Sequence, residues 1–175
     1  MSRPLEFAVL CDRKAAFFAL LSFYTQDEQH ESLLLALTAA AFKGRIDYVR
    51  ALLNHGVNPN LISRRSQGCF ILGTHTCFAL LPAVYWGYFD IVKLLISRGA
   101  DVNIQAACEA GGIASPGREP HIRRPRSALS VVRDRWRLYP SNHSYLDILS
   151  LLEKNGAGKH GESAEVEVIV ESLNE

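Results

Sequence analysis

The chain has 175 residues, of which 48% are hydrophobic and 21% charged, and its formal net charge is +1 at pH 7. This is the composition of an ordinary folded domain, and the length allows one extended core. No apolar run approaches the roughly 20 residues of a membrane helix, because Asp12, Arg13 and Lys14 interrupt the apolar amino terminus. We find no signal peptide, and four cysteines without a dense spacing pattern favour a reducing compartment. We therefore expect a cytoplasmic or nuclear protein.

One unit recurs along the chain, and its ending is its most regular part. The endings read YVRALLNHGVNPN at 48–60, IVKLLISRGADVN at 91–103 and ILSLLEKNGA at 148–157. Gly56 and Gly99 each follow another glycine by 12 residues, at Gly44 and Gly87. Glycine readily takes the left-handed conformation that ends helices. Apolar residues at helical spacing between these glycines predict a helix-turn-helix hairpin that needs neighbours to bury its apolar face.

The two central units resemble the ankyrin repeat. LALTAAAFKGRIDYVRALLNHGVNPN (35–60) and FALLPAVYWGYFDIVKLLISRGADVN (78–103) follow its pattern, roughly TPLHxAAxxGHxEIVxLLLxxGADVN over about 33 residues. The resemblance implies an all-α ankyrin-repeat solenoid of helix-turn-helix units with projecting finger loops. It also implies a binding surface in place of a catalytic pocket.

We expect four repeats, in one domain that spans residues 1–158. In chain order they cover 3–26, 34–60, 77–103 and 126–157. The first has Asp12 where the glycine between the helices would stand. The fourth is split by RLYPSNHS (137–144), which we interpret as an insertion.

Two longer insertions separate the later repeats, at 61–76 and 104–125, and an acidic tail follows at 159–175. Long loops in a compact repeat array are often binding elements, although neutral drift also accumulates there. The tail sequence EVEVIVES leaves three alternatives open: a terminal cap that folds back towards the basic residues, an unstructured segment, or a strand added to a partner sheet.

The first-helix openings depart from the TPLH pattern. They read RPLE, LALT, FALL and SALS, and only the last keeps the capping hydroxyl, at Ser127. Pro82 falls near the end of a first turn, where its missing donor costs more than at the first position. We therefore expect that helix to begin late, near Leu81.

The resemblance implies a concave binding face made of finger loops and exposed first-helix positions. Those positions are Leu10 and Cys11 in the first repeat, Phe42 and Lys43 in the second, Tyr85 and Trp86 in the third, and Asp134 and Arg135 in the fourth. The aromatic residues Phe42, Tyr85 and Trp86 stand out among them. Tyr88 adds another ring. Exposed aromatic residues are enriched at interface hot spots. The alternative is that these rings only pack against the insertions.

Arginines are expected to add charge to this face. The candidates are Arg64, Arg65, Arg123, Arg124 and Arg126. A second hypothesis takes the whole Arg118–Arg137 segment as the site of an anionic partner, either an acidic protein or nucleic acid. Nucleic acid is the less favoured of the two, because the rest of the chain is not basic.

Chemistry at a cofactor or metal is not expected. A zinc site can be drawn from Cys69, His75 and Cys77 with Cys108 or His121, but the paired CxxC spacing is missing. No nucleophile motif or phosphate-binding loop is recognisable. We therefore predict a non-enzymatic, monomeric protein without cofactor or metal, which binds another protein through the concave face and long loops.

Overall fold

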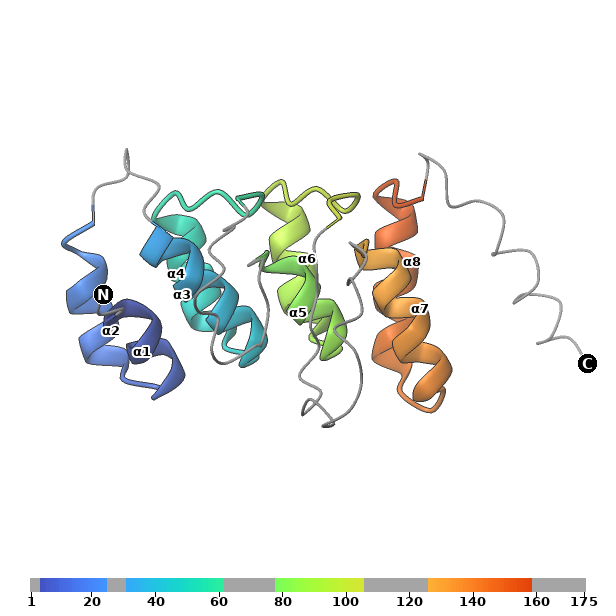
Figure 1. The fold of residues 1–175 in the computed structure, drawn as a ribbon, viewed down its shortest axis with the longest axis horizontal. Coiled ribbons are helices and arrows are strands. Elements are labelled where there is room, and N and C mark those ends of the chain that lie inside the picture. Colours follow the sequence, from blue (N-terminus) through green and yellow to red (C-terminus); the bar gives the residue numbers. More distant parts are fainter. Residues whose placement is uncertain (1–3, 25–30, 62–77, 106–125, 159–175) are drawn as a thin grey trace, which may run out of the picture.

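A computed structural model describes residues 4–24, 31–61, 78–105 and 126–158, and within these ranges all regular elements are helices (Figure 1). Their bounds are α1 Pro4–Leu10, α2 Lys14–Leu21, α3 Glu31–Phe42, α4 Ile46–Asn54, α5 Leu80–Tyr85, α6 Phe89–Ser97, α7 Ala128–Leu138 and α8 His143–Lys154. The predicted all-α repeat architecture is confirmed.

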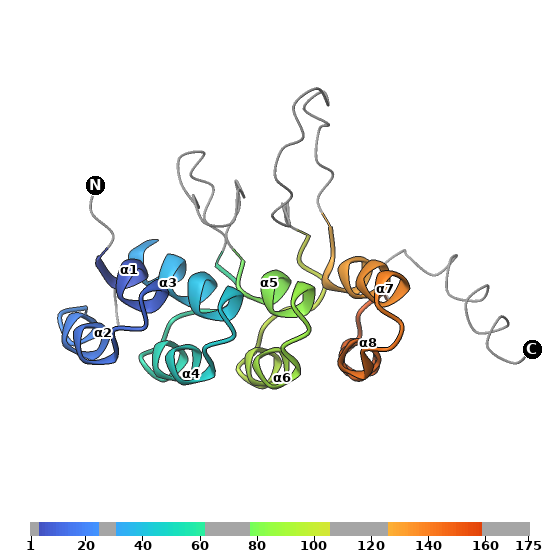
Figure 2. The ribbon, with the colours of Figure 1, turned by 90° about the horizontal axis from the view of Figure 1, so that it is seen from below.

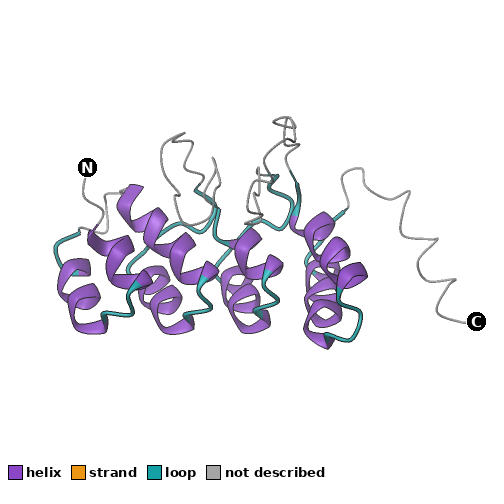
Figure 3. Cartoon of the chain, turned by 60° about the horizontal axis from the view of Figure 1, so that its bottom comes forward, coloured by secondary structure: helices purple, strands orange, loops and turns teal. Residues whose placement is uncertain are grey.

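The described helices pair into four hairpins, which stand side by side in chain order (Figures 1 and 3). Figure 2 shows two layers: α1, α3, α5 and α7 form one, and α2, α4, α6 and α8 form the other. We call these the first-helix layer and the second-helix layer. Each first helix packs against the next along the row, from α1 to α7.

The core lies between the layers and between neighbouring hairpins. In α3, every residue from Leu33 to Ala41 is buried, because α1, α4 and α5 all pack against this helix. The small side chains of Ala39, Ala40 and Ala41 let these neighbours approach closely. A helix buried on all sides carries apolar residues all round, unlike a surface helix.

Left-handed residues end the helices, as the glycine spacing predicts. Gly44 and Gly87 have φ angles of 68° and 74°, and the closing glycines of the last three repeats are also left-handed. Asp12 takes the same conformation, with φ 53°. Asp12 is thus the counterpart of those glycines, which confirms its predicted place in the repeat frame.

A tyrosine covers the turn between the helices of the preceding repeat. A Cβ atom added at Gly44 would lie 2.8 Å from the Tyr88 ring, and one at Gly87 would lie 3.2 Å from the Tyr145 ring. The first turn is different, because Asp12 has a side chain. There the Tyr48 hydroxyl donates a 2.8 Å hydrogen bond to Asp12 Oδ1, and Arg45 pairs with Oδ2 at 3.2 Å.

Asparagines connect the finger turns. Asn60 donates from Nδ2 to the Gly99 carbonyl at 2.8 Å, and its Oδ1 accepts from the Asp101 amide at 2.7 Å. Asn103 repeats the arrangement one unit later, with Gly156 and Gly158 at 3.4 and 3.3 Å. One side chain thereby satisfies backbone groups of the following repeat.

Local expectations at the helix ends can be compared with the structure. Helix α5 begins at Leu80, next to the expected Leu81, and Pro82 occupies its third position, where an amide would have no intrahelical acceptor. Half of the 137–144 segment is helical: 137–138 end α7, 143–144 begin α8, and 139–142 lie between them. Ser127 caps α7 as predicted, accepting from the Ser130 amide at 3.2 Å.

Gly44→Ala should destabilise the protein much more than Gly56→Ala. Both sites have positive φ, which costs about 1 kcal/mol for alanine. Only Gly44 has a ring against it, and crowding there should add about 1–3 kcal/mol. Urea unfolding of the two variants measures the difference; equal losses would contradict the packing of Tyr88 on this turn.

Tyr48→Phe should change how the stability of the protein depends on pH in the alkaline range. Burial and the hydrogen bond to Asp12 raise the pKa of Tyr48 from 10.0 to about 12. Below the pKa of Tyr48 in the unfolded chain, the folded and the unfolded protein both keep the hydroxyl proton. Between the unfolded and the folded pKa, only the unfolded chain loses this proton, so the free energy of unfolding should fall as pH rises. Unfolding midpoints over this range should decline less for Tyr48→Phe than for the parent, with Tyr139→Phe as control; parallel curves would refute the assignment.

Candidate interface: an aromatic strip across three repeats

Aromatic rings at the ends of α3 and α5 meet across two repeats. The Phe42 and Trp86 ring centroids are 5.7 Å apart at 78°, and those of Tyr85 and Trp86 are 5.3 Å apart at 82°. Edge-to-face contacts of this kind are favoured by the ring quadrupoles. The predicted residues Phe42, Tyr85 and Trp86 are therefore one continuous group.

Two cations lie over these rings. Lys43 Nζ is 5.6 Å from the Phe42 centroid, and Arg135 Cζ is 4.2 Å from Tyr85 and 4.5 Å from Tyr139. Such cation–π contacts fix a charged group without neutralising it. We call the set Phe42, Lys43, Tyr85, Trp86, Arg135 and Tyr139 the aromatic strip.

Arg135 is the most constrained member of the strip. Its guanidinium contacts two rings, and its buried Nε has no hydrogen-bond acceptor in the part of the chain that the structure describes. Burial lowers the pKa of Arg135, but the Tyr145 hydroxyl and the nearby tyrosines raise it by more, so the net shift is upward. Arg135 therefore stays charged.

The repeat frame explains why these residues are neighbours. Lys43, Trp86 and Arg135 occupy equivalent positions near the ends of α3, α5 and α7, and those helices pack side by side. Tyr139 joins them because it directly follows the last residue of α7, four positions after Arg135, and its ring contacts the Arg135 guanidinium. Stacking of the repeats thus brings residues at one equivalent position of each repeat side by side in a row.

Exposure differs along the strip. Trp86 is 43% exposed and Tyr139 49% exposed. Lys43 is exposed too, whereas Phe42, Tyr85 and Arg135 are half-buried. The half-buried rings support the exposed ones from below, which is the usual arrangement of an anchoring residue and its surroundings at a protein interface.

Tyr88 does not belong to this group. Sequence reasoning placed it on the binding face as an additional ring, but it is half-buried over Gly44 and packed against the core. Tyr88 immediately precedes α6, and Gly87 separates it from Trp86. Tyr88 supports the stack by covering the turn at Gly44.

The predicted basic residues are only partly described. Arg126 forms an ion pair with Asp134 and donates to the Ser130 carbonyl at 3.1 Å. Arg137 lies 3.9 Å from the same Asp134. Arg126 is therefore bound to α7 and is not a free charge on the strip. Arg64, Arg65, Arg123 and Arg124 lie outside the described residues.

Sequence reasoning missed two members of the strip as binding residues. Arg135 stands at the equivalent first-helix position of the fourth repeat, but neither it nor Tyr139 was chosen as a binding residue of the concave face. The repeat alignment alone puts Arg135 beside Trp86. No sequence pattern shows that its side chain turns under two rings.

The described ranges hold no group of three or more metal-ligating side chains. Every residue of the weak zinc hypothesis lies outside them, and Cys11 is an exposed free thiol. Among the described helices, none combines the length and apolar character needed to cross a membrane.

A comparison with known families agrees with the fold and the repeat frame. The family model for ankyrin repeats in three copies matches residues 5–106, which is more than half of the chain. The match includes the helix pairs from α1 to α6, and α7 and α8 follow it with the same arrangement. The chain therefore belongs to the ankyrin repeat family.

Proposed function

We propose that this protein is a non-enzymatic binding module that holds a partner protein on the aromatic strip. Ankyrin repeats generally serve as protein–protein interaction modules and are typically not catalytic. The observation that carries the proposal is the contact chain from Phe42 through Trp86 and Tyr85 to Arg135, which joins three repeats into one surface.

The composition of the strip suits a protein partner. Exposed Trp86 and Tyr139 offer large ring area at a low entropy cost, and residues of these types dominate binding energy at interfaces. Lys43 and Arg135 flank the rings, and neither forms an ion pair with a described carboxylate. A partner with an apolar segment and an acidic rim matches both features.

The Arg118–Arg137 segment remains the alternative site, for an anionic partner. Within its described part, Asp134 already pairs with Arg126 and Arg137, which lowers the charge available to a polymer. Salt distinguishes the two hypotheses, because binding to phosphates weakens steeply with salt and anchoring by rings does not.

Trp86→Ala should abolish most of the affinity for the partner. Truncation of a central aromatic anchor costs about 2 kcal/mol or more, roughly a thirtyfold rise in Kd. The partner is first isolated by affinity capture from cell extract, and its Kd is then measured with purified components by calorimetry.

Phe23→Ala is the matched control, because Phe23 is 83% exposed but lies in the first hairpin, away from the strip. It should bind like the parent. Circular dichroism verifies that Trp86→Ala is folded. Unchanged Kd in a folded Trp86→Ala protein, with binding lost in high salt, would move the site to the basic segment.

Arg135→Gln should weaken binding modestly and reduce its salt dependence, whereas Trp86→Ala should lower affinity at every salt concentration. A solvent-accessible ion pair with a carboxylate of the partner contributes about 0.2–1 kcal/mol and is screened by salt. Kd values of parent, Arg135→Gln and Arg135→Lys across a salt series test this. Equal slopes for Arg135→Gln and parent would show that Arg135 only supports the rings.

A further inference from the structure

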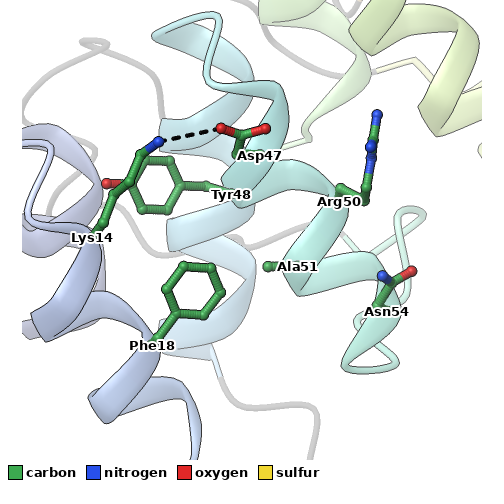
Figure 4. A pocket seen from close by; sticks show the side chains of 7 residues that line it. All are labelled: Lys14, Phe18, Asp47, Tyr48, Arg50, Ala51 and Asn54. Carbon is green, nitrogen blue, oxygen red and sulfur yellow. Dashed lines mark hydrogen bonds and ion pairs between the residues drawn. The ribbon is translucent and has the colours of Figure 1, made fainter.

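In the second-helix layer, neighbouring helices pack less extensively between α2 and α4 than between α4 and α6 or between α6 and α8. Helix α4 packs against α6, and α6 packs against α8, but a cleft of about 330 Å³ lies between α2 and α4 (Figure 4). It is lined by Lys14, Phe18, Asp47, Tyr48, Arg50, Ala51 and Asn54. The volume falls in the range of sites that hold a side chain or small ligand.

A small residue opens the cleft. Ala51 stands five residues before the closing glycine of its repeat, and the residues at the same place in α6 and α8 are Leu94 and Leu151. Both leucines pack against the core from the second-helix layer. Alanine lacks the atoms that would fill the seam, so the space remains.

The opposite wall carries an unusual phenylalanine. Phe18 lies six residues after Asp12, and the residues six after Gly44 and Gly87 are Arg50 and Lys93. The first repeat therefore has an aromatic ring where its neighbours have a cation. The ring is 51% exposed, although adjacent Phe17 is fully buried against Tyr48.

Charges border this apolar wall. Lys14 Nζ and Asp47 Oδ2 form a 3.3 Å ion pair on one side of the cleft, and Arg50 stands on the other (Figure 4). Asn54 is engaged, since its Oδ1 accepts from Arg98 at 2.8 Å. Arg50 has no acidic partner in the described residues. The net uncompensated charge of the cleft is thus positive.

We propose that the α2–α4 cleft is a second docking site, for a short acidic segment of a partner protein. An apolar side chain of that segment covers the exposed face of Phe18 and fills the space above Ala51, and an adjacent carboxylate pairs with Arg50. The site is independent of the aromatic strip, because its helices belong to the other layer (Figure 2).

Fluorescein-labelled synthetic peptides test the proposal by fluorescence anisotropy with the full-length protein. One series carries a central Leu-Glu pair on a Gly-Ser background; two matched series replace the Leu with Ser or the Glu with Gln. The Leu-Glu series should bind about tenfold more tightly than either control, because each loses one of the two contacts. Failure of every Leu-Glu peptide to bind would overturn the proposal.

Three variants locate the binding. Phe18→Ala and Arg50→Gln should each lower the affinity about tenfold. Ala51→Leu should abolish binding while preserving stability, because it restores the residue of α6 and α8 and closes the cleft. This variant keeps the test decisive if Phe18→Ala fails to fold.

Two controls separate this site from other surfaces. Phe7→Ala removes a 66% exposed ring from α1 and should leave peptide binding unchanged. Trp86→Ala should also leave it unchanged, so that failure of the aromatic strip and failure of the cleft are distinguishable. Binding that survives Ala51→Leu, or self-association through the cleft in place of peptide binding, would contradict the assignment.

Discussion

The structure depends on contact between neighbouring hairpins, because no hairpin here buries its own apolar side. Helix α3 shows this most clearly: all residues from Leu33 to Ala41 are buried, and helices on three sides are needed to bury them. The tyrosines extend the same dependence to the turns. Tyr88 and Tyr145 lie where a side chain on the preceding glycine would be, so a turn in one repeat and a ring in the next specify each other.

The same stacking creates the candidate interface. Equivalent positions in successive repeats become spatial neighbours, so that Lys43, Trp86 and Arg135 form a row although the chain separates them widely. Variation at one frame position then alters the chemistry of a whole surface without disturbing the core. The cleft between α2 and α4 arises in the same way in the other layer, where Ala51 and Phe18 alter the contact between these two helices.

Backbone features were the most predictable part of the fold. A left-handed turn accepts few residue types, so glycines at fixed spacing, and Asp12 in their place, were readable from the sequence. Side-chain packing between repeats was not. Tyr88 looked like another surface ring because its position over Gly44 depends on the neighbouring hairpin. The 137–144 segment was recognised as an insertion, but its sequence did not show that α7 continues through Leu138 and that α8 begins at His143.

The part of the candidate site that depends only on a residue's position in the repeat could be predicted from the sequence. Phe42, Tyr85 and Trp86 were found from position alone, and Arg135 had the right position but no visible reason to be selected. Its selection rests on two rings, one from another repeat and one just after the end of α7. Contacts of that kind join residues distant in sequence, and no local pattern encodes them.

The sparse contact between α2 and α4 also bears on how the stack comes apart. In a repeat protein each unit is held mainly by its neighbours, so a terminal unit, which has one neighbour, is lost before an internal one. Within the first hairpin the two helices are held unequally. Helix α1 packs along α3, whereas α2 meets α4 through a few side chains, among them Phe17 against Tyr48 and Lys14 paired with Asp47. We therefore expect opening of this hairpin to begin at α2, with its amide protons exchanging before those of α1 and α3.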